Sequence, residues 1–265
     1  MLTRSKGARV TNGAEGTTPH VAGAAYWFFT PLVTRMVTRA AIATGFVLIA
    51  SWRGMSFAEL RHAVASERTV AAALPLWIQV PLILFLADLL AYCTHRIFHG
   101  RTLWMFHAIH HSSRTVTWIS SVRLHPVNDV VARVVQVFPL YWLGFNGAAL
   151  AGVVPVLTLY ALLLHASLDW TYGPLRYAIA SPTFHRWHHT SQEEGLDKNF
   201  AGLFPFIDLA FGTFYMPPDR RPERFGVVGE QVPEGLLAQL AYPFRSELSP
   251  SSAPADGSRG RGGQR

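Results

Sequence analysis

The chain has 265 residues, of which 50% are hydrophobic and 15% charged, and its formal net charge is +7 at pH 7. This composition favours one domain in a lipid bilayer, and the arginines are scattered among apolar runs instead of forming the basic stripe of a nucleic-acid-binding protein. The single cysteine, Cys93, excludes an internal disulfide framework and a cysteine-based zinc or iron–sulfur site within the chain.

The two ends of the sequence differ from the rest. Residues 1–23 are largely polar and basic at the start and lack the compact apolar core and cleavage site of a secretory signal. Residues 246–265 are rich in Ser, Pro, Gly and Arg and cannot build a core. We therefore expect two disordered tails that flank one domain at 24–245.

Four apolar runs approach the length of a membrane-spanning helix, which is about 20 residues for a bilayer core about 30 Å thick. The first lies near 37–52 and is the weakest, because it is short and Arg35 and Arg39 stand at its start, and the second, 71–94, is the strongest. The third and fourth lie within 130–170, where Gly144 and Gly147 indicate a turn between two antiparallel helices. The sequence thus predicts a helical hairpin at the end of the series.

Four passes would place both termini on one side of the membrane. Arginines near 4–39, 96–133 and 176–224 outnumber those in the loop 53–70, which predicts that the former segments face the cytoplasm. The expected fold is an all-α integral membrane protein: a four-helix transmembrane bundle with a cytosolic, histidine-rich helical cap. The alternative is that two of the runs are buried helices of a soluble α-protein.

Three histidine clusters, HRIFH, HAIHH and HRWHH, carry the strongest signal in the sequence. On a helix the ends of HxxxH lie about 40° apart and the histidines of HxxHH span about 100°, so each cluster can point its rings at one centre. With 12 histidines in the chain, HxxHH is expected roughly 0.02 times by chance, yet it occurs twice. The clustered residues are His95, His99, His107, His110, His111, His185, His188 and His189.

The number of imidazoles predicts two metal ions. Imidazole suits zinc, copper, iron or nickel, and one tetrahedral zinc takes four protein ligands at most. The single histidines His125 and His165 could add to the set, although a lone histidine is more often a hydrogen-bonded core residue. Two metal sites that open toward an apolar bundle suit the oxidation of a lipid by dioxygen. Inert C–H bonds resist acid–base chemistry, so their oxidation needs a metal-bound oxidant.

From Asp88 to Phe214 the sequence resembles the fatty acid hydroxylase/sterol desaturase superfamily of membrane non-haem di-iron enzymes. The resemblance rests on the segments DLLAYCTHRIFH, LWMFHAIHHSS, RLHP, LLLHASLDW, HRWHHT and DKNFAGLFPFIDLAFGTF. It implies a four-helix bundle, a cytosolic site with two Fe ions, and O2 as co-substrate. The implied metal ligands are His95, His99, His107, His110, His111, His125, His165, His185, His188 and His189.

The sequence departs from the superfamily pattern after the third cluster. Where that pattern usually reads Asn-Tyr-Gly and Trp-Asp, this chain has NFAG and FID, so Phe200 lacks a hydroxyl. Asn199 and Asp208 remain as candidates to orient ligand imidazoles from outside. Asp88 is a third candidate, because it precedes His95 by seven residues and lies within about 20° of it around a helix.

These features predict a membrane-bound, O2-dependent hydroxylase or desaturase of a fatty acyl, sterol-like or related lipid. Two electrons must come from outside, because the sequence has no nucleotide-binding fingerprint, haem-attachment motif or iron–sulfur cysteines. The expected donor is a ferredoxin or a cytochrome b5 type protein with its reductase. Basic residues such as Arg220, Arg221 and Arg224 could dock an acidic donor.

Three other functions stay open at this stage. A bis-histidine haem b electron carrier also suits four membrane helices, although HxxHH supplies adjacent ligands that haem cannot use. A zinc-dependent membrane hydrolase would need a glutamate base, and Glu193 and Glu194 lie near the third cluster. A metal transporter should carry ionisable residues through the bundle, where only Asp88, Arg133 and His165 come close.

Overall fold

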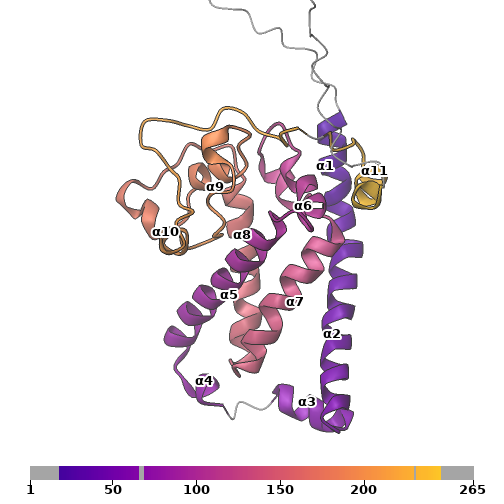
Figure 1. The fold of residues 1–265 in the computed structure, drawn as a ribbon. Coiled ribbons are helices and arrows are strands. Elements are labelled where there is room, and N and C mark those ends of the chain that lie inside the picture. The colour runs from indigo at the N-terminus through magenta and orange to yellow at the C-terminus, as the bar shows by residue number, and fades with distance from the viewer. Residues whose placement is uncertain (1–17, 66–68, 230, 246–265) are drawn as a thin grey trace, which may run out of the picture.

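The computed structural model describes residues 18–65, 69–229 and 231–245, and within these ranges the chain is helical (Figure 1). The described part has no strands, only an isolated antiparallel bridge between Thr190 and Phe225. The all-α prediction is therefore confirmed. Most of the two predicted tails lies outside the described residues, but helix α1 (Thr18–Phe29) begins inside the tail expected at 1–23.

Three helical runs are long and apolar enough to cross a membrane. The first, Gly23–Trp52, joins α1 through a π-helical turn, η1 (Thr30–Thr34), to α2 (Arg35–Trp52). The others are α5 (Leu76–Phe98) and α8 (Gly147–Leu164). The first run is longer than the sequence predicted, because the π-helical turn carries the helix through a proline that would otherwise end it.

The fourth predicted pass is α7 (Pro126–Trp142), which has 17 residues. It is shorter than the three candidate spans and carries Asp129 and Arg133. The Thr38 hydroxyl of α2 donates to Asp129 at 2.8 Å, and Arg133 lies 3.7 Å from the same carboxylate. α7 packs against α2 and α5, and α5 packs against α8 (Figure 1). Four long helices therefore pack together, and three of them have the length and composition of a membrane span.

Helices α7 and α8 form the predicted hairpin, with the turn at 143–146. Gly144 has φ +77°, in the left-handed region that a residue without Cβ adopts at little cost. Asn146 caps α8, because its Oδ1 accepts hydrogen bonds from the N–H groups of Ala148 and Ala149 at 2.8 and 3.1 Å. Gln79 of α5 accepts from the Asn146 N–H at 3.1 Å, which ties the turn to the neighbouring helix.

Two sets of shorter elements close the ends of the long helices. At one end lie α3 (Phe57–Ala65) and α4 (Val70–Ala73), which we call the tip. The other end, the cap, consists of α6 (Trp104–His111), η2 (Trp118–Val122), η3 (Gly173–Tyr177), α9 (Pro182–His188), η4 (Glu193–Gly195), α10 (Phe206–Ala210), α11 (Leu236–Ala241) and η5 (Tyr242–Phe244). Both α1 and α11 lie at the cap end (Figure 1).

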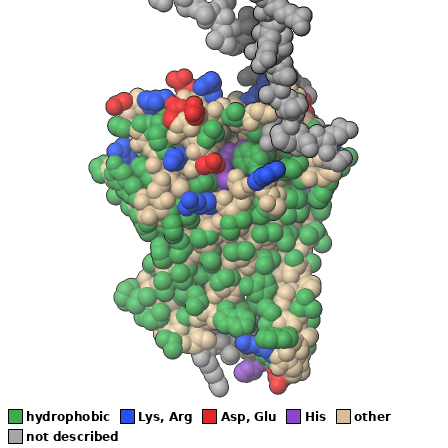
Figure 2. All heavy atoms as spheres, viewed as in Figure 1, with side chains coloured by type: hydrophobic (Ala, Val, Ile, Leu, Met, Phe, Trp, Pro, Cys, Tyr) green, Lys and Arg blue, Asp and Glu red, His purple; other side chains and the backbone are tan. Residues whose placement is uncertain are grey.

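The surface is divided in the same way as the fold. Figure 2 shows hydrophobic side chains over the long helices, whereas charged side chains gather at the cap and, more sparsely, at the tip. Large apolar residues of the long helices are exposed, including Leu48 at 63%, Trp77 at 75% and Leu159 at 66%. A surface of this kind suits lipid and not water.

Candidate metal centre

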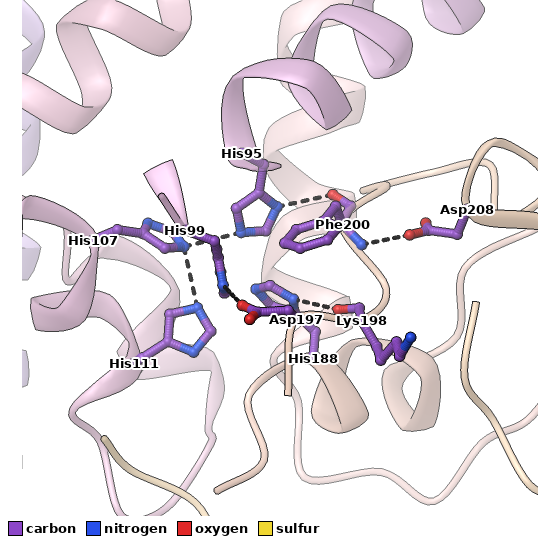
Figure 3. Close-up of polar contacts among 9 residues, drawn as sticks. All are labelled: His95, His99, His107, His111, His188, Asp197, Lys198, Phe200 and Asp208. Carbon is purple, nitrogen blue, oxygen red and sulfur yellow. Dashed lines mark hydrogen bonds and ion pairs between the residues drawn. The ribbon is translucent and has the colours of Figure 1, made fainter. Parts of the chain in front are cut away.

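Nine of the ten predicted histidine ligands converge in the cap and form two groups. The five-histidine group consists of His95, His99, His107, His111 and His188, and the four-histidine group of His110, His165, His185 and His189. Within each group the possible ligand atoms all lie within 4.8 Å of one another. Figure 3 shows the five-histidine group, whose members come from α5, α6 and α9.

The helices divide their histidines between the two groups, so the prediction that each HxxHH cluster points its rings at one centre is wrong. On α6, His107 and His111 are one turn apart and join the five-histidine group, whereas His110 points to the other group. Helix α9 makes the opposite division, because His188 joins the five-histidine group and the remaining two histidines of HRWHH join the four-histidine group. The groups adjoin, since the rings of His111 and His189 stack with centroids 4.4 Å apart.

Hydrogen bonds fix the orientation of several rings. The Nδ1 atom of His95 lies 2.8 Å from the Phe200 carbonyl oxygen, and that of His188 lies 2.8 Å from the Lys198 carbonyl oxygen (Figure 3). Because a carbonyl can only accept, Nδ1 carries the proton in both rings. Their Nε2 atoms are then unprotonated in the neutral ring and can bind a metal.

Three more rings are held in the same way. His99 Nδ1 donates to the Asp197 carboxylate at 2.9 Å, and His107 Nδ1 donates to the Asn128 Oδ1 at 2.7 Å. In the four-histidine group, His165 Nδ1 donates to the Ala161 carbonyl at 2.8 Å. In metalloproteins, acceptors of this kind bond to the nitrogen of an imidazole that does not bind the metal and so fix the orientation of the ring.

The Nε2 atoms face one another at short distances. His107 Nε2 lies 3.0 Å from His95 Nε2, and both rings carry their proton on Nδ1. Two lone pairs at this distance repel unless a cation neutralises them. Two nitrogens at right angles on one metal, each bonded at about 2.1 Å, would lie about 3.0 Å apart. The buried Nε2 atoms of His99 and His188 have no hydrogen-bond partner, so the donor set fits a metal ion.

The four-histidine group has similar spacings. His165 Nε2 lies 3.2 Å from His110 Nε2 and 3.1 Å from His185 Nε2. His185 Nε2 in turn lies 3.1 Å from His189 Nε2. Each group therefore gathers its nitrogens around its own centre.

Burial keeps these imidazoles neutral. Loss of solvation, followed by the influence of neighbouring imidazoles, lowers the pKa well below its ordinary value for His107, His110, His111, His185, His188 and His189. Burial also lowers the pKa of His165 to about 4. Near neutral pH these rings are thus unprotonated, which is the form that transition metals bind.

The structure does not bring His125 to either group. It is the N-cap of α7, where its Nδ1 accepts from the Val127 N–H at 3.1 Å and its Nε2 donates to the Leu240 carbonyl at 3.1 Å. Pro126 occupies the first helical position, which suits a residue without an N–H. The sequence RLHP therefore marks the start of a helix, and we leave His125 out of the proposed ligand set.

The segment 197–204, which we call the clamp loop, is held by the three side chains that the sequence predicted to orient the imidazoles from outside. These are Asp88, Asn199 and Asp208. Asp88 on α5 accepts from the N–H groups of Gly202, Leu203 and Phe204 at 2.8, 3.0 and 2.7 Å. Its carboxylate thus bonds to the clamp loop, and the clamp loop in turn bonds to imidazoles. Asp88 supports the rings through an intermediate segment and not by direct contact.

Asp208 and Asn199 act on the same loop. Asp208 accepts from the N–H groups of Phe200 and Ala201 at 2.8 and 2.9 Å and from the Thr213 hydroxyl at 2.6 Å (Figure 3). The Asn199 amide donates to the Phe184 carbonyl at 2.9 Å and to the Tyr215 carbonyl at 2.7 Å. The clamp loop is therefore fixed from α5, α9 and α10 before it reaches the histidines.

Sequence reasoning missed Asn128 and Asp197, the two described side chains other than histidines that hydrogen-bond to the converging rings. Asn128 lies two residues after the HP dipeptide and is buried in the first turn of α7. Asp197 opens the quoted segment DKNF, but only the neighbouring Asn199 was singled out. The other direct partners are backbone carbonyls, which leave no signal in a sequence.

A surface pocket of about 320 Å³ also opens on the cap. It is lined by Thr171, Gly173, Pro174, Arg176, Tyr177, Met216, Pro217, Pro218 and Arg221. None of the converging histidines lines it. Its buried residue, Met216, belongs to one apolar cluster with Leu164 and Phe184, the residues that precede His165 and His185. The pocket is therefore separate from the two histidine groups, although its floor packs beside them.

Comparison with known proteins covers the part of the chain that contains the histidine groups. The fatty acid hydroxylase family matches residues 80–213, a span that contains all nine converging histidines. The ornithine lipid hydroxylase OlsE of Rhizobium tropici is 34% identical over 171 residues, which cover 64% of this chain and 51% of that protein.

More distant relatives include two eukaryotic proteins. The alkylglycerol monooxygenase of Caenorhabditis elegans is 27% identical over 164 residues, covering 62% of this chain and 32% of that protein. The very-long-chain aldehyde decarbonylase GL1-7 of Oryza sativa is 29% identical over 161 residues, covering 56% and 25%. The chain spans about half the length of the first of these relatives and a smaller part of the other two. No solved structure gave a significant match. On the family match and the histidine arrangement together, the chain belongs to the fatty acid hydroxylase family.

Proposed function

We propose that this protein is a membrane-bound, O2-dependent lipid hydroxylase in which each histidine group holds one iron ion. The observation that carries the proposal is the convergence of nine histidines into two adjoining groups at the end of membrane-length helices. When bound, two iron ions would activate dioxygen and oxidise an unactivated C–H bond. Hydroxylation is favoured over desaturation because the named relatives include a hydroxylase and a monooxygenase.

The protein itself contributes ligands, orientation and exclusion of water. The Phe200 ring covers the five-histidine group, with its centroid 4.9 Å from that of His99 and 5.7 Å from that of His188. The Trp104 ring also packs against this group, with its centroid 5.1 Å from that of His99 and 5.5 Å from that of His111. These aromatic rings keep solvent away from the reacting centre, where water would compete with a lipid chain.

The location of the groups supports a lipid substrate. His95 lies in the last turn of α5, and His165 is the C-cap of α8, so both groups lie where candidate membrane spans end. A lipid carbon chain could reach this depth without leaving the bilayer. The substrate class that we propose is a polar lipid with an acyl or alkyl chain, as the names of the relatives that act on ornithine lipid and alkylglycerol suggest.

We further propose that the cap faces the cytoplasm and receives electrons from a separate ferredoxin or cytochrome b5 type donor. The segments 96–123 and 176–224 of the cap side have more arginines than the segment 53–70, where the sequence has Arg53, Arg61 and Arg68, and this agrees with the positive-inside rule. The basic cap surface could attract an acidic donor.

The alternative functions fit the site less well. A porphyrin fills four coordination positions of its iron and leaves two for histidine, whereas these groups offer five and four imidazoles. For a zinc hydrolase, neither nearby glutamate joins a group, because Glu193 is exposed and Glu194 pairs with Arg220. Both histidine groups found within the described residues consist of imidazoles alone.

Lipid profiling tests the proposed function. Membrane lipids of cells that express the wild-type chain should contain a species heavier by one oxygen than those of cells without it. The variant His110→Ala should abolish this species, because it removes a proposed ligand, while the protein still inserts into the membrane. The matched control is His125→Asn, which keeps a capping acceptor outside both groups and should retain the product. A product that persists in His110→Ala would contradict the proposed site.

A further inference from the structure

The clamp loop contacts the two histidine groups unequally. Three imidazoles of the five-histidine group bond through Nδ1 to this loop: His99 to the Asp197 carboxylate at 2.9 Å, His188 to the Lys198 carbonyl at 2.8 Å, and His95 to the Phe200 carbonyl at 2.8 Å (Figure 3). In the four-histidine group, His165 bonds to the Ala161 carbonyl of its own helix, and the buried His185 Nδ1 has no partner. The two histidine groups thus differ in the groups that bond to the Nδ1 atoms of their rings.

The backbone of the clamp loop turns where it meets the histidines. Asp197 has φ +53° and Asn199 has φ +60°, both in the left-handed region, which aspartate and asparagine adopt more readily than other residues with a Cβ atom. The contacts from Asp88 and Asp208 hold the following residues of the loop. These contacts and turns fix the conformation in which the loop presents its acceptors to the rings.

Asp197 differs from the other partners because it brings a charge. Its side chain is 74% exposed, whereas that of His99 is 7% exposed. Among the described residues, no other carboxylate forms an ion-pair contact with a histidine of either group. The opposite nitrogen of the ring, His99 Nε2, is buried without a hydrogen-bond partner and lies among the ligand atoms of the five-histidine group.

We propose that Asp197 is a positioning residue that strengthens metal binding in the five-histidine group through His99 and so makes the two metal positions inequivalent. Its carboxylate holds the His99 ring in one orientation, keeps the proton on Nδ1 and leaves Nε2 as the nitrogen that faces the metal position. The four-histidine position has no such carboxylate partner in the described structure. This inference rests on the proposed function, because it assumes that both groups hold a metal.

Chelator competition tests the inference without any measurement of activity. The wild-type protein and its variants are loaded with Co²⁺ or Fe²⁺ in detergent and exposed to rising chelator concentrations, and the metal left per chain is measured. Asp197→Ala should lower the affinity for one of the two ions about 10- to 100-fold and leave the affinity for the other unchanged. The affinity of Asp197→Asn should lie between those of the wild-type protein and Asp197→Ala, because its amide oxygen still accepts from His99 but carries no charge. Asp197→Glu should restore most of the affinity.

Asp169→Asn is the matched control. Asp169 is also an exposed cap aspartate, with a side chain 77% exposed, and it pairs with Arg186 instead of a histidine of either group. Its variant should keep the wild-type chelator curve, and far-UV circular dichroism should show that all variants stay folded. The inference is overturned if Asp197→Ala keeps the wild-type curve or weakens both ions equally. A wild-type protein that binds no transition metal would overturn the proposed function itself.

Discussion

At the scale of single residues, two neighbours in the sequence serve different centres. His110 and His111 are adjacent on α6, yet they belong to different histidine groups. Successive residues of a helix point about 100° apart, so adjacent histidines cannot serve one ion as readily as residues one turn apart. The second histidine of each HxxHH cluster thus reaches across to the other group, and the two centres share their scaffold.

Buried neutral histidines make the stability of the metal-free protein depend on pH. In the unfolded chain these side chains titrate near 6.5, whereas burial lowers the pKa of His165 to about 4. Between these values the unfolded state binds more protons, so the free energy of unfolding falls as the pH falls. His165 alone contributes on the order of 3 kcal/mol to this change, at about 1.4 kcal/mol per pKa unit.

Thermal unfolding of chelator-treated protein in detergent measures this effect. The melting temperature should decrease as the pH is lowered from about 7 to about 4.5, and the His165→Asn variant should show a weaker dependence. A melting temperature that stays constant or rises over this range would mean that the rings are solvated or already protonated in the folded state.

The converging histidines could be predicted from the sequence, but the groups that bond to their rings could not. The spacing of HxxxH and HxxHH identifies eight histidines, and His165 joins them as an isolated residue at the end of an apolar run. Asn128 has no pattern that distinguishes it from other helical asparagines. The carbonyls of Lys198 and Phe200 are present in every residue, and only the folded loop selects them.

At the scale of elements, the clamp loop depends on a carboxylate of a long helix. Asp88 on α5 accepts three N–H groups from the loop at 2.7 to 3.0 Å. In Asp88→Asn, one oxygen is replaced by an NH₂ group, which donates and therefore opposes one of these N–H groups. We expect the free energy of unfolding to fall by about 1–3 kcal/mol and the five-histidine group to retain metal less well.

Asp129→Asn provides the control for this variant. Asp129 is likewise a carboxylate on a long helix, but its partners are Thr38 and Arg133, and it does not bond to the clamp loop. Loss of the Asp129 carboxylate should lower the melting temperature of the protein without releasing metal. If Asp88→Asn and Asp129→Asn retain metal equally well, the clamp loop does not position the rings.

The lengths of the elements show where sequence patterns stop being informative. The hairpin of α7 and α8 was predicted because Gly144 and Gly147 interrupt a long apolar run. The start of the first run was missed, because Arg35 and Arg39 interrupt the apolar pattern, although the helix continues through both of them from Gly23. The position of α7 inside the bundle follows from packing against two other helices, which a hydropathy pattern does not contain.

At the scale of the whole molecule, the four long helices connect a charged cap with a small tip (Figures 1 and 2). An even number of helices between the two ends agrees with the position of α1 and α11, which both lie at the cap. If the apolar surface of these helices lies in a bilayer, the cap and the tip must face opposite sides of the membrane. The excess of arginine at the cap then predicts which side is cytoplasmic.

Labelling of introduced cysteines tests this orientation. The background variant Cys93→Ser removes the native thiol, and Asp219→Cys or His62→Cys then places a single thiol at an exposed position of the cap or the tip. A membrane-impermeant maleimide should label Asp219→Cys in sealed inside-out vesicles and His62→Cys in right-side-out vesicles. The reverse pattern would place the histidine groups outside the cytoplasm and remove the proposed cytosolic donor from reach. Labelling of both positions in the same vesicles would mean that the long helices do not cross the bilayer, so the exposed apolar surface would need another partner.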